Sequence, residues 1–124
     1  MLVSVIIPTY NRLSFLNNAI KSVLNQTYTT FEIIVINDNS DDGTNEFLEK
    51  FNNSKIKHIR NDKTLYAPAS RNIGIAKAKG DLVAFLDDDD EWYPNKLEDQ
   101  VKLFSDKSIG LVYGGIDLFF EDYN

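Results

Sequence analysis

Short apolar runs rich in β-branched residues alternate along this chain with segments that carry apolar residues at helical spacing. The run Val3–Ile7 is almost continuously apolar, and Phe31–Ile36 and Leu82–Leu86 have a similar character. A strand inside a parallel sheet is covered on both faces, so such runs are typical of parallel sheets. The alternation therefore restricts the chain to a layered fold in which helices pack on a mostly parallel sheet.

The segments between these runs have the spacing of amphipathic helices. Apolar residues recur every three or four positions from 13 to 24, and we expect a second helix from 44 to 51. Ile56–Ile59 is a shorter candidate strand. These units predict an α/β fold with a doubly wound, mostly parallel sheet and right-handed crossovers.

The second half of the chain continues the same alternation. We expect a helix that Pro68 opens in its first turn and that Gly80 ends as a left-handed cap. Pro94 should open another helix, and Leu111–Tyr113 should add a further strand.

The composition fits one compact domain of a soluble protein. Of 124 residues, 43% are hydrophobic and 26% charged, and cysteine is absent, which excludes disulfides and a cysteine nucleophile. The net charge of −6 argues against a nucleic-acid-binding face. No apolar run approaches the roughly 20 residues that span a bilayer, and the N-terminus lacks the basic lead of a secretory signal. We expect a cytoplasmic protein and leave open a peripheral attachment to the membrane.

Polar clusters follow three of the apolar runs directly. They are Pro8–Asn11, Asn37–Ser40 and Asp87–Asp90. In open α/β sheets, ligands bind outside the carboxyl ends of the strands, where the connecting loops converge. The sequence therefore predicts that these three clusters lie together at one edge of the sheet.

The acidic run from Asp87 to Glu91 is the most unusual of these segments. Five adjacent carboxylates repel one another, and a cation would offset their charge. Mg²⁺ or Mn²⁺ prefers oxygen ligands and is commonly held by one or two carboxylates together with phosphate and water. The alternative is a solvated acidic turn that caps the helix near Pro94. The position of the run directly after an apolar strand favours the metal.

Three other residues near these clusters have side chains suited to a nucleotide. Asp38 could accept a hydrogen bond from a nucleobase N–H, or it could belong to a turn rich in helix caps. Tyr10 offers a flat face to a base, or it packs in the core. Arg71 matches diphosphate oxygens, or it lies on a helix surface. We interpret His58 and Trp92 as structural residues.

Two well-known phosphate-binding or catalytic signatures are missing from the sequence. It contains no glycine-rich loop of the dinucleotide or P-loop type, which argues against a dehydrogenase or an ATPase. It also lacks the nucleophile elbow of the α/β-hydrolases.

Taken in order, these segments resemble the family 2 glycosyltransferases, which adopt the GT-A fold. The likeness lies in residues 3–12, 22–28, 31–38, 71–74 and 80–90. The last of these segments ends like the DXD motif of the family, and Trp92, Pro94 and Leu97 match what usually follows it. One departure is Asp38-Asn39-Ser40, where the family often has Asp-Gly-Ser.

The resemblance implies roles for eight residues. Asp89 would be the principal ligand of Mg²⁺ or Mn²⁺, with Asp87 beside it, and Asp38 would hydrogen-bond the base. The residues around the nucleotide would be Pro8, Thr9, Tyr10, Asp38, Arg71, Asp87 and Asp88.

The resemblance also implies a reaction. A sugar would pass with inversion from a nucleotide-diphosphate donor, a UDP-sugar, to a hydroxyl of a saccharide or lipid-linked acceptor in polysaccharide biosynthesis. Residues 1–124 would be a single donor-binding domain without the acceptor-binding part. The general base of the family lies beyond the last residue, and we assign neither Glu121 nor Asp122 as that base.

Two alternatives remain beside an active transferase. The first is a non-catalytic or truncated nucleotide-sugar-binding module that needs a missing segment or a partner. The second is a nucleotidyltransferase that makes the sugar nucleotide. That enzyme would need a glycine- and arginine-rich loop after the first strand, and residues 8–12 are not such a loop.

Overall fold

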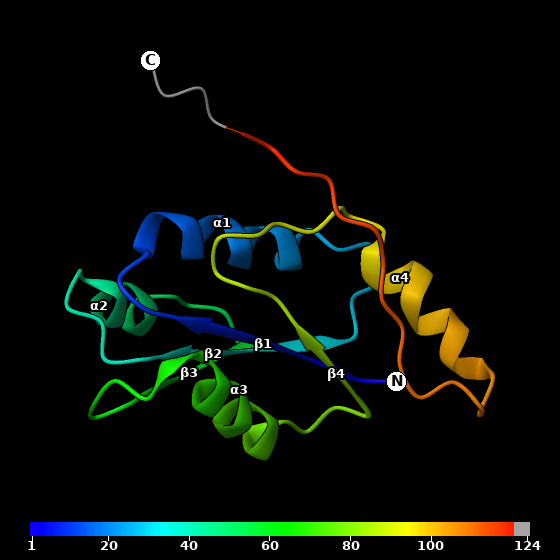
Figure 1. Ribbon diagram of the computed structural model, residues 1–124, viewed down its shortest axis with the longest axis horizontal. Helices are drawn as coiled ribbons and strands as arrows, with labels where there is room; N and C mark the ends of the chain where they lie inside the picture. The colour runs from blue at the N-terminus through cyan, green and yellow to red at the C-terminus, as the bar shows by residue number, and fades with distance from the viewer. Residues whose placement is uncertain (121–124) are drawn as a thin grey trace.

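The computed structural model describes residues 1–120 (Figure 1). Strands and helices alternate along the chain, and a short 3₁₀ helix, η1, follows the last α-helix. The elements are β1 (Val3–Thr9), α1 (Leu13–Leu24), β2 (Phe31–Asn37), α2 (Thr44–Glu49), β3 (Ile56–Arg60), α3 (Tyr66–Lys77), β4 (Leu82–Phe85), α4 (Lys96–Val101) and η1 (Lys102–Ser105).

The four strands within residues 1–120 form one parallel sheet in the order β3-β2-β1-β4. Val5 in the central strand β1 lies opposite Ile33 of β2 and opposite Ala84 of β4. Helices α1 and α2 cover one face of the sheet, and α3 covers the other (Figure 1). The predicted α/β fold with a doubly wound, parallel sheet is therefore confirmed. The direction of winding changes between β1 and β4.

Burial on both faces explains the continuous apolar runs of β1 and β2, but not that of β4, where Val83 and Phe85 are exposed. Every residue of β1 and β2 is buried. Val5 and Ile33 belong to the cluster that packs against Leu16 and Ile20 of α1. Each such side chain contributes about 1.5–3 kcal/mol when it leaves water, so this layer is the main source of stability. On the opposite face Gly74 of α3 lies directly over a strand of the sheet, where an added Cβ would come within 2.5 Å of the side chain of Ile6.

The predicted helix has Pro68 in its first turn, as expected, because α3 begins at Tyr66. Its predicted end is wrong, because the helix stops at Lys77 with an extended residue, Ala78, as its C-cap. Gly80 is not a left-handed cap. A Cβ on Gly80 would lie 2.7 Å from the backbone nitrogen of Ser4, so the reason for glycine here is the close approach of this loop to β1.

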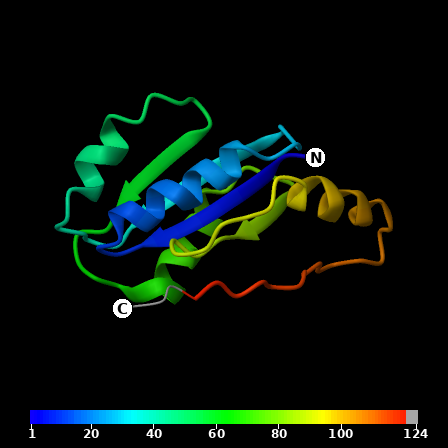
Figure 2. The same cartoon turned by 90° about the horizontal axis from the view of Figure 1, so that it is seen from above.

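The predicted strand at Leu111–Tyr113 is wrong. Leu111 and Tyr113 are 80% and 87% exposed, and the segment has no ladder partner in the described part of the chain. It continues from η1 as an extended trace along the outside of the molecule (Figure 2). A hollow of about 510 Å³ lies between this segment, β4 and α4. A strand forms only when a neighbour accepts and donates its backbone hydrogen bonds, and the hollow keeps β4 out of reach.

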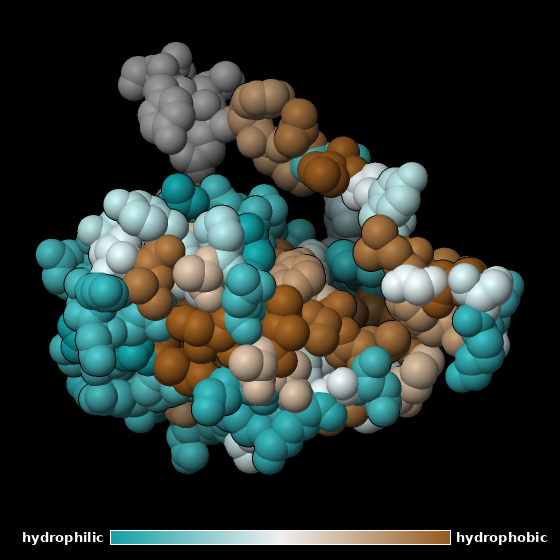
Figure 3. Space-filling model, turned by 60° about the horizontal axis from the view of Figure 1, so that its bottom comes forward, coloured by the Kyte–Doolittle hydropathy of each residue, from teal (hydrophilic) through white to brown (hydrophobic). Residues whose placement is uncertain are grey.

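Hydrophobic side chains stay exposed along this extended segment (Figure 3), and Val83 and Phe85 of the edge strand β4 are exposed as well. Among residues 1–120, no helix is long and apolar enough to cross a membrane. The large hydrophobic side chains that are exposed after η1 are Leu111, Tyr113, Ile116, Leu118, Phe119 and Phe120.

Candidate functional site

The turns at the carboxyl ends of β1, β2 and β4 meet in one pocket of about 360 Å³. The pocket lies where the winding of the sheet reverses, the place at which doubly wound folds bind their ligands. The structure brings all eight predicted site residues into its lining, although their roles stay predictions. The lining consists of Pro8, Thr9, Tyr10, Arg12, Asp38, Ala67, Ser70, Arg71, Asp87, Asp88 and Asp89.

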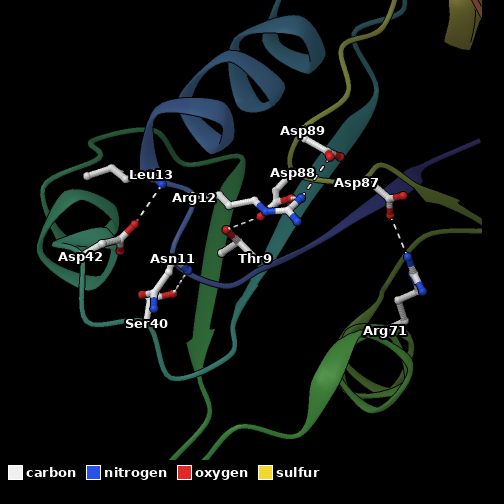
Figure 4. A network of polar contacts seen from close by, with 10 residues as sticks. All are labelled: Thr9, Asn11, Arg12, Leu13, Ser40, Asp42, Arg71, Asp87, Asp88 and Asp89. Atoms are coloured by element: carbon white, nitrogen blue, oxygen red, sulfur yellow. Dashed lines mark hydrogen bonds and ion pairs between the residues drawn. The ribbon is translucent and has the colours of Figure 1, made fainter. Parts of the chain in front are cut away.

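The turn after β1 is held in place by the loop that follows β2 (Figure 4). The backbone N–H of Asn11 donates to Ser40 Oγ at 3.0 Å, and the N–H of Asp41 donates to Asn11 Oδ1 at 2.8 Å. Asn11 has a φ of 51°, in the left-handed region that asparagine tolerates better than most residues. The N–H of Leu13, the first residue of α1, donates to Asp42 Oδ2 at 3.0 Å. The β2 loop therefore caps α1 and fixes the direction in which residues 10–12 point.

Asp88 anchors the acidic loop from the inside. It is 6% exposed, and Thr9 Oγ1 donates a hydrogen bond to its Oδ2 at 2.9 Å. Arg12 Nη1 lies 3.3 Å from its other oxygen. Burial raises the pKa of Asp88, while the hydrogen bond from Thr9 and the charge of Arg12 oppose that shift. The Asp88 carboxylate thus faces the turn after β1, whereas its neighbours in the run are exposed.

Asp87, Asp89 and Asp90 form the outer part of the acidic loop. One carboxylate oxygen from each lies within 4.8 Å of the others. Burial, followed by the charges of the neighbouring aspartates, raises the pKa of Asp90. Hard divalent cations such as Mg²⁺ and Mn²⁺ bind oxygen donors of this kind, so the residues fit the metal that the sequence suggests. Asp90 joins the predicted ligands Asp87 and Asp89 in this group.

Two arginines now neutralise part of this charge from opposite sides (Figure 4). Arg71 of α3 places Nη2 at 2.7 Å from Asp87 Oδ1. Arg12 places Nη1 at 3.0 Å from Asp89 Oδ2. The ion pair of Arg71 joins the middle of α3 to the acidic loop, and so closes one side of the pocket.

Asp38 holds the start of α3. Its carboxylate is almost buried, and it accepts hydrogen bonds from the backbone N–H groups of Leu65 and Tyr66, both at 2.8 Å. A third donor is Asn61 Nδ2 at 2.9 Å. Asp38 therefore does cap a helix, but the helix is the distant α3 and not α2, which follows the turn that Asp38 begins. Contact with a base stays a prediction, although the residue lines the pocket.

Other sequence interpretations can be placed as well. Tyr10 is 49% exposed at the pocket, so the alternative of a core tyrosine is wrong. Trp92 packs against the hydrophobic core, and its backbone N–H donates to Ser22 Oγ at 3.1 Å. His58 lies within β3 and does not line the pocket. Glu121 and Asp122 lie outside the described residues.

Three lining residues were missed by the sequence analysis. Ala67 and Ser70 stand three apart on α3 and share a face with Arg71 and Gly74, so helical spacing counted back from Arg71 could have found them. Arg12 directly follows the predicted cluster Pro8–Asn11, but its charge was not considered there.

The chain folds as a parallel α/β sheet with a carboxylate-lined pocket at its switch point, and solved structures place this fold among the GT-A glycosyltransferases. Residues 1–349 of S. aureus TarS in complex with UDP match with a TM-score of 0.78 and 30% identity, over 85% of this chain and 32% of that chain. The mannosyltransferase PcManGT from Pyrobaculum calidifontis matches with a TM-score of 0.79 at 24% identity, over 87% of this chain and 33% of that one, and supports the fold alone.

The sequence also matches known relatives along nearly its whole length. Residues 4–124 match the family described as glycosyl transferase family 2, and the chain belongs to that family. An Escherichia coli relative, the UDP-Glc:alpha-D-GlcNAc-diphosphoundecaprenol beta-1,3-glucosyltransferase WfgD, is 38% identical over 94% of this chain and 46% of its own length. The putative teichuronic acid biosynthesis glycosyltransferase TuaG of Bacillus subtilis is 34% identical over 98% of this chain and 49% of its own. The chain thus spans about half the length of these curated relatives.

Proposed function

We propose that this chain binds the nucleoside diphosphate of a UDP-sugar together with Mg²⁺ or Mn²⁺, as the donor-binding part of an inverting glycosyltransferase. The observation that carries the proposal is that the turns after β1, β2 and β4 meet in one pocket. Membership of glycosyl transferase family 2 supports the class of reaction. The complexes of TarS with UDP and with UDP-GlcNAc support a uridine nucleotide as the ligand.

The pocket offers each part of the nucleotide a suitable partner. Tyr10, half-exposed beside Pro8 and Thr9, provides a ring on which a base can stack. Asp38 Oδ2 accepts one hydrogen bond, from Tyr66, and a carboxylate oxygen can accept a second from a base N–H. The guanidinium of Arg71, which is now paired with Asp87, matches the geometry of phosphate oxygens. When a diphosphate binds, Arg71 would leave Asp87 and pair with the phosphate.

Asp89 and Asp87 would hold the cation, with Asp90 as a third oxygen donor. A bound cation would offset the negative charge that grows on the departing diphosphate. Asp88 is held inward by Thr9 and Arg12 and does not belong to the three carboxylates that could share a cation, so we propose that it contacts the ribose instead.

Transfer itself is proposed for the whole protein. The name of WfgD specifies a lipid diphosphate-linked sugar as the acceptor, which supports an acceptor of that class here and a reaction at a membrane surface. Since the chain spans about half of such relatives, we propose that the acceptor site and the general base come from outside residues 1–124. The alternative function is a nucleotide-sugar-binding module without transfer, and turnover distinguishes the two.

Calorimetric titration of the purified chain with UDP tests the proposal. We expect binding in Mn²⁺ or Mg²⁺ and a large loss of affinity in excess chelator. Asp89→Ala should remove the dependence on metal, whereas Asp62→Ala, an exposed carboxylate outside the pocket lining, should leave it unchanged. Equal affinity in chelator would contradict the metal, and no binding under any condition would contradict the donor site.

A second assay tests whether residues 1–124 can bind the donor but cannot transfer the sugar. With metal and UDP-sugar at saturation, residues 1–124 should release sugar to an added acceptor no faster than to water. Loss of a general base alone costs about 10²–10⁴ in rate. Rapid transfer by this chain would place the base within it.

A further inference from the structure

Arg12 is the charged residue of the pocket that the proposed function does not place in contact with the nucleotide or the cation. It directly precedes α1, and the turn in front of it is fixed by the hydrogen bonds of Asn11 to Ser40 and Asp41. Its backbone carbonyl accepts the first helical hydrogen bond, from Leu16, at 2.9 Å. The backbone of Arg12 is therefore rigid, and its half-exposed side chain extends over the acidic loop (Figure 4).

The guanidinium of Arg12 bridges two carboxylates that differ in what else they bind. Asp88 is satisfied from within, because Thr9 donates to its second oxygen at 2.9 Å. Asp89 is exposed, and within residues 1–120 its carboxylate receives a hydrogen bond from Arg12 alone, at 3.0 Å. Asp89 also belongs to the group of three carboxylates that can meet around one cation. Arg12 and a cation would therefore compete for the same oxygen atoms.

We propose that Arg12 is the internal counter-ion of the acidic loop, which a divalent cation must displace from Asp89 before it can bind. This inference rests on the metal site of the proposed function. A cation at Asp87, Asp89 and Asp90 brings two positive charges next to a guanidinium that is in direct contact with Asp89, and the two repel each other. Arg12 is 51% exposed at its side chain, so it can swing away without breaking any buried contact except the long one to Asp88.

The displacement of Arg12 from Asp89 couples the binding of the cation to the binding of the diphosphate. Arg12 lines the same pocket as Tyr10 and Arg71, so a guanidinium released from Asp89 stays within reach of a diphosphate. A cation that binds alone must separate the Arg12–Asp89 pair without replacing it. A cation that binds with a diphosphate gives Arg12 a new partner, and by linkage each ligand then favours the other. Arg12 is in this sense a positioning residue, since it acts through the occupancy of Asp89.

The test measures Mn²⁺ binding in the absence of nucleotide. Arg12→Gln should bind Mn²⁺ about two- to fivefold more tightly than the parent chain, which corresponds to the loss of one exposed ion pair. Electron paramagnetic resonance of free Mn²⁺ provides the readout. Arg60→Gln is the matched control, because it removes the same charge from the end of β3, where no ion pair with the acidic run is formed. Arg12→Lys keeps the charge and should restore an affinity nearer to that of the parent.

The outcomes separate this inference from the proposed function. If the parent binds Mn²⁺ and Arg12→Gln binds it equally or more weakly, the counter-ion role is wrong and the metal site stands. If Arg60→Gln strengthens binding as much as Arg12→Gln, the effect is general charge and the inference is again wrong. If neither the parent nor Arg12→Gln binds Mn²⁺ while UDP binds, the metal of the proposed function fails and this inference fails with it.

Discussion

Replacing Asp38 with asparagine tests the most heavily used polar side chain of the pocket. Asp38 Oδ1 accepts from Leu65 N and Asn61 Nδ2, and Oδ2 accepts from Tyr66 N. An asparagine side chain has one oxygen and one NH₂ group, so in either orientation a donor faces a donor. The less costly orientation keeps the oxygen at the Oδ1 position and turns the NH₂ group toward the N–H of Tyr66.

The expected cost follows from what is lost in that orientation. Hydrogen bonds to a charged group contribute about 1.5–3 kcal/mol, and a buried N–H left without a partner costs a similar amount. Tyr66 also has a φ of 70°, a strained value for a bulky residue that the carboxylate helps to hold. We expect Asp38→Asn to lower the free energy of unfolding by about 2–3 kcal/mol, and the melting temperature by about 10 °C.

Thermal and urea unfolding measure this cost, and titration with UDP separates it from recognition. Asn61→Ala is the control, because Asn61 is buried, donates to Asp38 and does not line the pocket. Both variants should be destabilised, but only Asp38→Asn should weaken UDP binding, by about 1–3 kcal/mol. Unchanged stability of Asp38→Asn would refute the role in holding α3. Equal loss of UDP binding in both variants would refute the contact with the base.

Three further substitutions test the fold and its charge. Gly80→Ala should lower the free energy of unfolding by about 1–3 kcal/mol in urea titrations, because its Cβ would lie 2.7 Å from Ser4 N; a neutral result would contradict the close approach. Gly74→Ala should destabilise in the same assay despite the better helix propensity of alanine, since its Cβ would lie 2.5 Å from Ile6, and a gain in stability would show that Ile6 can move. Asp90→Asn, in chelator at pH 7, should stabilise by a few tenths of a kcal/mol after allowance for screening. The raised pKa of Asp90 gives stability that is present below the ordinary value of 3.8 and lost as pH rises through the folded value, so the gain should vanish below pH 3.8.

The sequence was most informative where one physical requirement acts on a whole segment. The strands β1 and β2 had to be apolar on both faces, and the predicted runs Val3–Ile7 and Phe31–Ile36 fall within the observed strands. The carboxyl ends of parallel strands share one edge, so the three polar clusters could be brought together without any distance being known. The eight predicted residues therefore reach one pocket.

Interactions between distant residues could not be predicted in the same way. Position 80 requires glycine because the backbone of Ser4, 76 positions earlier in the chain, lies too close for a Cβ. The residues next to Gly80 in the sequence suggested a helix cap instead. Leu111–Tyr113 has the local character of a strand, but a strand also needs a neighbour within hydrogen-bonding reach, and β4 lies across the hollow. The side chain of Arg12 pairs with Asp88 and Asp89, which lie 76 and 77 positions away, so the residues next to Arg12 in the sequence do not reveal these ion pairs.

The balance of charge in the pocket connects these observations to the ligand. Four carboxylates, Asp38, Asp87, Asp88 and Asp89, face two guanidinium groups, so the lining repels a diphosphate as it stands. The carboxylates of Asp38 and Asp88 already accept hydrogen bonds within the protein. The excess negative charge that an approaching ligand meets is therefore that of Asp87 and Asp89. These are the carboxylates that hold Arg71 and Arg12. A divalent cation at the two exposed aspartates would cancel their charge and free both arginines at once. The pocket would then change from repelling a diphosphate to attracting it, and the order of binding would be set by the cation.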